Sequence, residues 1–260
     1  MMKDVIASSS VGAGKTRRFR RVVQSDGRAC LVAIDHAAYM GAGPPLDTME
    51  AIASGGPDAI LATWNLARSH AETFADCGLV LRVDGGISEL GSFATSDLSS
   101  LLYRAEQAIA VGADAVVLLT FPGASDEERS LQRLTALVSE CELLGLPVMA
   151  EAIPGGWAKE IEWTIENVAR AARISVELGA DIVKTVCPGP TEEFAAVVDA
   201  VPAPVVALGG PKMATDDDVV ALAGGVVRAG AAGIAFGRNV WGASDPRALV
   251  RRLHATVHGG

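Results

Sequence analysis

The sequence predicts a single-domain (β/α)8 barrel, the TIM-barrel member of the α/β class, and three observations favour it. Eight short apolar segments alternate with amphipathic segments along 260 residues, without a break in composition. Half of the residues are hydrophobic and a fifth are charged, so the chain can bury one large core. A similar sequence recurs at three expected helix-to-strand junctions, Val111-Gly112-Ala113-Asp114, Leu178-Gly179-Ala180-Asp181 and Ala229-Gly230-Ala231-Ala232. A seven-stranded open sheet is the main alternative.

The eight apolar segments have the composition of parallel strands covered on both faces, which form nearly continuous Val, Ile, Leu and Ala runs. They are residues 30–34, 59–61, 79–83, 115–119, 147–150, 182–183, 204–208 and 233–236. Because each is followed by a helix-like segment, we expect all eight to run parallel in one sheet.

The segments between the strands have apolar residues three and four positions apart, as expected for helices that cover a sheet. The clearest are residues 97–111, 126–144, 165–178, 192–201 and 216–228. Gly112, Gly145, Gly179 and Gly230 follow helix-like segments and are expected to end helices in the left-handed conformation. Residues 1–28 are predicted to be an N-terminal extension whose helix closes the bottom of the barrel, and residues 29–260 the barrel itself.

Charge and composition narrow the functional classes. The net charge is −9, with 22 basic and 31 acidic side chains, which argues against nucleic acid as a partner. No window is long and apolar enough to span a bilayer, and residues 1–14 lack the apolar core of a signal peptide, so we expect no membrane association and a cytoplasmic location. The four cysteines are far apart, without metal-binding spacing, so neither a metal nor another cofactor is expected.

Lys184 is the most informative residue, because it lies inside the apolar strand segment Ile182-Val183-Lys184-Thr185. Burial disfavours the charged form of a lysine and leaves a neutral amine that can attack a carbonyl carbon. The alternative is a lysine at a strand end that pairs with a carboxylate or reaches solvent. Catalytic residues of barrels lie at the C-terminal ends of the strands, where Lys184, Glu151, Asp35 and His36 are expected to meet.

Glycine-rich turns follow the seventh and eighth strands, at Leu208-Gly209-Gly210-Pro211-Lys212 and Phe236-Gly237-Arg238-Asn239-Val240. Glycines let backbone N–H groups approach phosphate oxygens, and an arginine adds a charge-assisted contact. Gly209, Gly210, Gly237 and Arg238 are therefore predicted to bind a phosphate group. The alternative is that these glycines only make tight turns.

The two turns, together with Asp35-His36, Gly14-Lys15 and Asp245-Pro246, closely resemble the archaeal-type class I fructose-bisphosphate aldolases. Relatives of that group include the amino-deoxy-heptulosonate synthases and the autoinducer-2 phosphate thiolase. The resemblance runs from about residue 14 to the C-terminus. It implies a Schiff base on Lys184 without a metal, a phosphate site after strands seven and eight, and a homo-oligomer, with Asp35 near the substrate hydroxyls.

The sequence departs from that family at the fifth strand, where the sugar-phosphate aldolases carry an acid/base tyrosine in the pattern Trp-x-Tyr-Pro-Arg-Gly. Here the stretch is Glu151-Ala152-Ile153-Pro154-Gly155-Gly156, so Ile153 stands in its place and cannot move a proton. Glu151 lies on the same strand face and can take the role if burial raises its pKa. Alternatively, Glu151 pairs with Lys184 or Arg82 as a structural ion pair.

The sequence thus predicts a metal-independent class I aldolase, a lyase that cleaves or forms a C–C bond in a small phosphorylated keto compound. Lys184 is assigned the Schiff base, and Glu151, supported by Asp35, the proton transfer. His36, Gly209, Gly210, Gly237 and Arg238 are assigned to substrate binding. The alternatives are a transferase on the same scaffold, by aldol transfer or by thiolase-like acyl transfer, and a phosphate-binding barrel without turnover.

Overall fold

Eight parallel strands close into one barrel in the computed structural model, which describes residues 12–39, 43–86 and 98–259. The barrel order is β1-β10-β9-β8-β7-β6-β3-β2, and all eight predicted strand segments are in it. The strands are β1 (Ala29–Ala33), β2 (Ala59–Ala62), β3 (Gly78–Arg82), β6 (Ala115–Thr120), β7 (Val148–Ala152), β8 (Ile182–Thr185), β9 (Val205–Leu208) and β10 (Gly233–Phe236). The predicted (β/α)8 barrel is therefore confirmed, and the open sheet is excluded.

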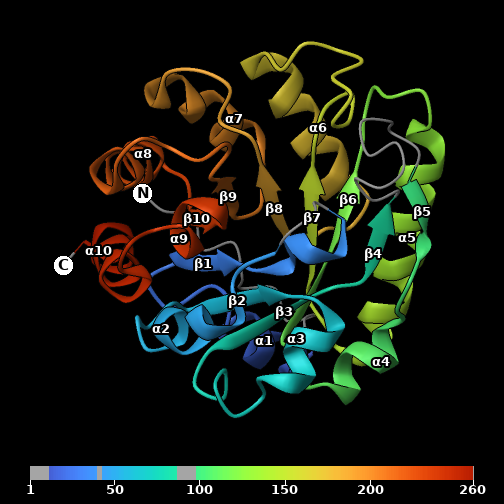
Figure 1. Cartoon of the computed structure of the whole chain (residues 1–260). Coiled ribbons are helices and arrows are strands. Elements are labelled where there is room, and N and C mark those ends of the chain that lie inside the picture. Colours follow the sequence, from blue (N-terminus) through green and yellow to red (C-terminus); the bar gives the residue numbers. More distant parts are fainter. Residues whose placement is uncertain (1–11, 40–42, 87–97, 260) are drawn as a thin grey trace.

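Helices surround the strands on all sides (Figure 1). They are α1 (Ala13–Phe19), α2 (Met49–Ala53), α3 (Trp64–Ser69), α4 (Ala105–Ala110), α5 (Glu127–Leu144), α6 (Ile165–Glu177), α7 (Ala195–Ala200), α8 (Asp216–Arg228), α9 (Arg238–Trp241) and α10 (Pro246–His258). Single 3-10 turns form at Asp35–Ala38, Leu46–Thr48 and Thr191–Phe194. In the described part of the chain, no helix combines the length and apolar character needed to cross a membrane.

The four glycines expected at helix ends have the predicted left-handed backbone. Gly112, Gly145, Gly179 and Gly230 have φ angles of 82°, 61°, 104° and 98°. The left-handed backbone of Gly145 ends α5, and its N–H donates to the Glu142 carbonyl and closes the last turn of this helix. An L side chain is strained at such a φ, so these helices end where glycine stands.

The helix predicted over residues 97–111 is wrong in its first half. Residues Leu98–Leu101 form strand β5, which pairs antiparallel with β4 (Asp84–Gly86) as a small hairpin beside the barrel. The N–H groups of Leu102 and Tyr103 both donate to the Val83 carbonyl, at 2.8 and 3.1 Å. Backbone pairing with the end of β3 thus outweighs a local helical pattern, and α4 begins only at Ala105.

Successive side chains of each strand point alternately outward and inward, and this divides the core into two clusters. Cys30, Val32 and Ile34 belong to a large cluster shared with the helices, whereas Leu31 and Ala33 belong to a smaller one inside the barrel. The other strand residues of the inner cluster include Leu61, Val80, Val117, Met149, Ile182, Val206 and Ala235. The lower part of the barrel interior is therefore packed with apolar side chains.

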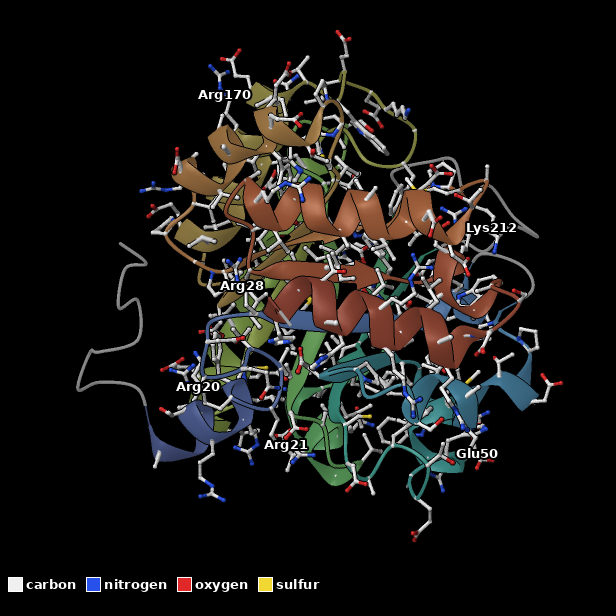
Figure 2. The ribbon with its side chains drawn as sticks, turned by 90° about the vertical axis from the view of Figure 1, so that its left-hand side faces the viewer. Arg20, Arg21, Arg28, Glu50, Arg170 and Lys212 are labelled. Carbon is white, nitrogen blue, oxygen red and sulfur yellow. The ribbon has the colours of Figure 1, made fainter. Side chains whose placement is uncertain are left out.

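The end of α1 and the segment after it cover the N-terminal end of the barrel. Phe19, Val22 and Val23 belong to the inner cluster and are buried. Lys15 pairs with Glu142 at 2.6 Å and with Asp181 at 2.9 Å. Figure 2 shows Arg20, Arg21 and Arg28 at one end of the molecule and Lys212 at the other. The domain boundary at residue 28 stays a prediction.

Candidate active site

Charged side chains form the layer above this apolar interior, at the C-terminal ends of four strands. Each lies two residues after a side chain of the inner cluster, and residues two apart on a strand point to the same face. The pairs are Ala33 and Asp35, Val80 and Arg82, Met149 and Glu151, and Ile182 and Lys184. The strand period that fills the barrel with apolar groups therefore also places these four charges together.

Lys184 and Glu151 are direct neighbours across β7 and β8. Lys184 Nζ lies 2.8 Å from Glu151 Oε1, and the two side chains are only 5% and 4% exposed. The other carboxylate oxygen of Glu151 accepts a short hydrogen bond from Nη2 of Arg82. Glu151 thus joins the buried lysine to a buried guanidinium, as one of the two sequence hypotheses expected.

Arg82 is the centre of the cluster, because its guanidinium contacts three carboxylates. Besides Glu151, it donates from Nε to Asp35 at 2.8 Å and from Nη1 to Asp84 at 3.2 Å. Asp84 also accepts the Leu119 N–H at 2.8 Å. A planar guanidinium can donate in several directions at once, which a lysine cannot do with the same geometry.

Burial alone would raise the pKa of Glu151, but the positive charges of Lys184 and Arg82 outweigh it and lower that pKa. The condition named in the sequence analysis, a Glu151 pKa raised by burial, is therefore not met. Burial likewise raises the pKa of Asp35, yet Arg82 and Lys184 bring it down from 3.8 to about 2. Both carboxyl groups are ionised at neutral pH and can accept protons.

The low pKa of Asp35 predicts a pH-dependent stability. Its lowering from 3.8 to about 2 corresponds to about 2 kcal/mol. This contribution is present above the unfolded value and is lost as the pH falls through the folded value. Between about pH 5 and pH 2, the difference in unfolding free energy between the wild type and Asp35→Asn should shrink by about 2 kcal/mol. Urea unfolding at several pH values measures it, and a constant difference would contradict the assignment.

His36 and Tyr39 close the cluster on the β1 side. Tyr39 donates its hydroxyl hydrogen to Asp35 Oδ2 at 3.0 Å, and the Arg82 guanidinium lies 5.7 Å from its ring centre. His36 Nδ1 lies 3.6 Å from Asp35 Oδ1, and among the described residues neither of these buried atoms has a hydrogen-bond partner. Burial lowers the pKa of His36, so its ring is neutral at pH 7. Two unpaired polar atoms side by side suit a ligand hydroxyl.

The turns after β9 and β10 are joined by hydrogen bonds. Arg238 donates from Nη2 to the Gly210 carbonyl at 3.0 Å, and Asn239 donates from Nδ2 to the Gly209 carbonyl at 2.9 Å. Gly210 has a φ of 63°, which only glycine adopts readily. A side chain at Gly237 would come within 2.4 Å of the His36 ring, so this close approach also requires glycine. These two turns, called the rim from here on, therefore lie against the charged cluster.

The DeoC/LacD family aldolase model matches residues 29–243, which is most of the chain and all eight strands of the barrel. The chain belongs to the DeoC/LacD aldolase family. Membership confirms the predicted enzyme class, an aldolase, and the family resemblance noted above.

Aldolases and synthases are among the most similar relatives. A fructose-bisphosphate aldolase class 1 from Thermoproteus tenax is 33% identical over 259 residues, with 95% of this chain and 96% of the relative covered. A 2-amino-3,7-dideoxy-D-threo-hept-6-ulosonate synthase from Halobacterium salinarum is 32% identical over 250 residues, with 95% and 92% covered. Both alignments span nearly the whole barrel.

A solved structure of an archaeal fructose-1,6-bisphosphate aldolase, with its catalytic lysine bound to the carbinolamine intermediate of the substrate, superimposes with a TM-score of 0.83. It is 29% identical in sequence, and the match covers 94% of this chain and all of that one. The barrel of this family member is thus close to that of a lysine-dependent aldolase.

The structure brings Lys184, Glu151, Asp35 and His36 together and places the predicted rim beside His36. Sequence reasoning treated Arg82 only as one possible partner of Glu151. The signal for Arg82 was a charged residue within the apolar run Leu79-Val80-Leu81-Arg82-Val83, the same signal that singled out Lys184. Ile153 is fully buried in the large apolar cluster, as its side chain requires.

Proposed function

We propose that Lys184 is the Schiff-base lysine of this aldolase and that its substrate is a small phosphorylated ketone. One observation carries the proposal. Lys184 Nζ lies in a buried layer at the catalytic end of the barrel, 2.8 Å from an ionised carboxylate that can accept its proton. The lysine-bound intermediate of the archaeal relative supports the same chemistry.

The chemistry follows from this pair. Glu151 accepts a proton from the Lys184 ammonium, and the free amine attacks the ketone carbon to form a carbinolamine. Protonation of the carbinolamine hydroxyl lets water leave and gives the iminium ion. Loss of the proton from the β-hydroxyl breaks the Cα–Cβ bond, and the electron pair moves into the iminium to give an enamine and an aldehyde. Protonation of the enamine carbon and hydrolysis release the second product and restore Lys184.

Glu151→Gln tests the proton transfer. The amide keeps the shape of the side chain but cannot accept the lysine proton, so kcat should fall about 10²-fold or more and the acidic limb of the pH profile should change. Glu142→Gln is the matched control, because Glu142 pairs with Lys15 at the opposite end of the barrel. Activity that persists with an unchanged pH profile would refute the role of Glu151.

We further propose that Gly209, Gly210, Gly237 and Arg238 hold the substrate phosphate. Arg238→Gln removes the positive charge at this rim, so KM should rise about tenfold with a smaller change in kcat. Steady-state kinetics measures the changes in KM and kcat separately. Arg228→Gln, an exposed change at the end of α8, should leave KM unchanged. An unchanged KM in Arg238→Gln would place the phosphate elsewhere.

Cleavage assays on a panel of phosphorylated ketoses distinguish the two remaining reaction types. The similarity to the heptulosonate synthase favours aldol transfer as the second candidate. A lyase releases an aldehyde from one substrate alone, whereas a transferase forms product only when an acceptor is supplied. We also propose a cytoplasmic location and a homo-oligomer, on the basis of the family resemblance.

A further inference from the structure

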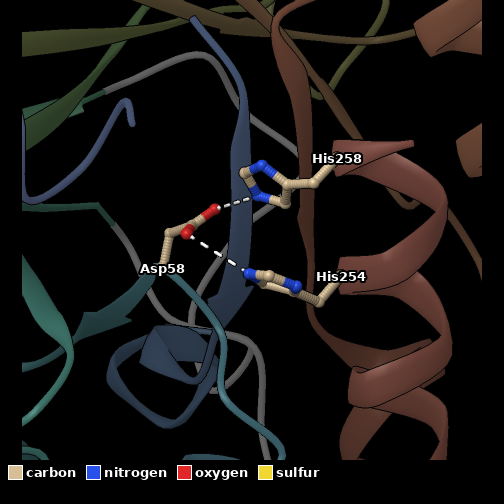
Figure 3. Close-up of side chains that lie close together, drawn as sticks. All are labelled: Asp58, His254 and His258. Atoms are coloured by element: carbon tan, nitrogen blue, oxygen red, sulfur yellow. Dashed lines mark hydrogen bonds and ion pairs between the residues drawn. The ribbon is translucent and has the colours of Figure 1, made fainter. Parts of the chain in front are cut away.

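Two histidines and an aspartate meet at the N-terminal end of the barrel, away from Lys184. Asp58 directly precedes β2, and His254 and His258 lie one turn apart on α10. Figure 3 shows both imidazole rings reaching from the helix toward the Asp58 carboxylate. One nitrogen or oxygen atom from each residue lies within 4.8 Å of those from the other two.

The spacing of these atoms suits a tetrahedral ion. His258 Nε2 lies 2.9 Å from Asp58 Oδ2, and His254 Nε2 lies 3.6 Å from Asp58 Oδ1. Two ligand atoms about 2.1 Å from a tetrahedral zinc ion lie about 3.4 Å apart. The two observed distances involve different oxygens of Asp58, and one ligand atom from each residue lies within 4.8 Å of the other two, so side-chain rotations have to draw the three ligands together around one ion.

Asp26 and the Cys30 N–H hydrogen-bond to the proposed ligands, as the groups around the ligands of a metal site do. Asp26 Oδ2 lies 2.6 Å from Nδ1 of His258, so a carboxylate orients this ring and leaves Nε2 directed at Asp58. The Cys30 N–H donates to Asp58 Oδ2 at 2.6 Å and fixes the aspartate. A carboxylate on the second nitrogen of a ligating histidine is a common feature of zinc sites.

We propose that Asp58, His254 and His258 form a Zn²⁺ site that ties α10 to the start of β2. Two imidazoles and one carboxylate suit zinc, whereas Mg²⁺ prefers oxygen ligands and keeps its water. The side chains of Asp58 and His258 are 6% and 15% exposed and that of His254 is 39% exposed, so an ion can enter from solvent. Water completes the fourth position.

Without the ion, Nδ1 of His258 faces the Asp26 carboxylate and Nε2 faces the Asp58 carboxylate. Zinc binds the neutral imidazole nitrogen, so a proton held on Nε2 passes to solvent when the ion binds. The site lies at the N-terminal ends of the strands, opposite the catalytic layer, and it is independent of the proposed function. Its role is to fasten the C-terminal helix, so zinc should raise the thermal unfolding midpoint.

Calorimetric titration of the full-length, tag-free and chelator-treated protein with Zn²⁺ tests the site. The wild type should bind one ion per chain, and Zn²⁺ but not Mg²⁺ should raise the unfolding midpoint. His254→Gln and His258→Gln should lose most of the affinity, and Asp26→Asn should lose about 10- to 100-fold. His70→Gln is the matched control, because His70 lies outside the cluster and contacts Ser69.

Circular dichroism and aldolase turnover establish that the His254→Gln protein is folded, since His254 is half-exposed and far from the catalytic layer. Absence of stoichiometric zinc binding by the wild type would overturn the proposal. Binding that is equally tight in His254→Gln, His258→Gln and the wild type would also overturn it, since the ion would then occupy another site.

Discussion

Replacement of Lys184 by methionine should abolish aldolase turnover, with a fall in kcat/KM of roughly 10⁵-fold, because the variant lacks the amine that the proposed mechanism uses to form the imine. Methionine has a similar length and is tolerated in a buried apolar setting. Glu151 keeps its hydrogen bond from Arg82, so its carboxylate is not left without a partner. Steady-state assays with the best phosphorylated ketose substrate measure the effect.

Two further variants separate loss of chemistry from loss of charge. Lys184→Arg keeps a cation beside Glu151 but cannot form an imine, so it should be as inactive as Lys184→Met. Lys15→Arg changes a lysine that pairs with Glu142 and Asp181 at the opposite end of the barrel, and it should retain turnover. Appreciable activity in Lys184→Arg would show that the reaction does not pass through a Schiff base.

Replacement of Arg82 by methionine should have the largest effect on stability. The change leaves the buried carboxylates of Asp35, Asp84 and Glu151 without their shared guanidinium. Removal of one partner from a buried ion pair costs about 3–5 kcal/mol, so the free energy of unfolding should fall by at least about that amount. Urea unfolding at neutral pH measures it.

The matched control is Arg68→Met, an exposed arginine on α3, which should change stability by less than about 0.5 kcal/mol. Arg82→Lys should recover part of the loss, because an ammonium neutralises charge but cannot donate to three carboxylates in one plane. A loss below about 1 kcal/mol in Arg82→Met would mean that the three carboxylates find other partners. It would contradict the central position of Arg82.

The barrel could be predicted because parallel strands buried on both faces are largely apolar, and all eight segments have that composition. The helix ends could be predicted from glycines for a different reason, because few other residues adopt the left-handed backbone that ends a helix. The hairpin of β4 and β5 could not be predicted in this way. Its pairing with the end of β3 depends on backbone hydrogen bonds, which leave little trace in the order of side chains.

The site was partly predictable. Lys184, Glu151 and Asp35 stand at strand ends, and topology alone brings strand ends together. The three contacts of Arg82 depend on side-chain directions, as does the downward direction of the Glu151 pKa. The cluster of Asp58 with His254 and His258 was missed, because metal spacing was sought among residues close in sequence. Here 200 residues separate Asp58 from His258.

Reductive trapping tests the central claim most directly. The protein is incubated with dihydroxyacetone phosphate and related phosphorylated ketones, borohydride is added, and the modified peptide is located by mass spectrometry. A Schiff base on Lys184 predicts one stable adduct on the peptide that contains Lys184 and none in Lys184→Met. Absence of an adduct across the panel, or an adduct on another lysine, would contradict the assignment of Lys184.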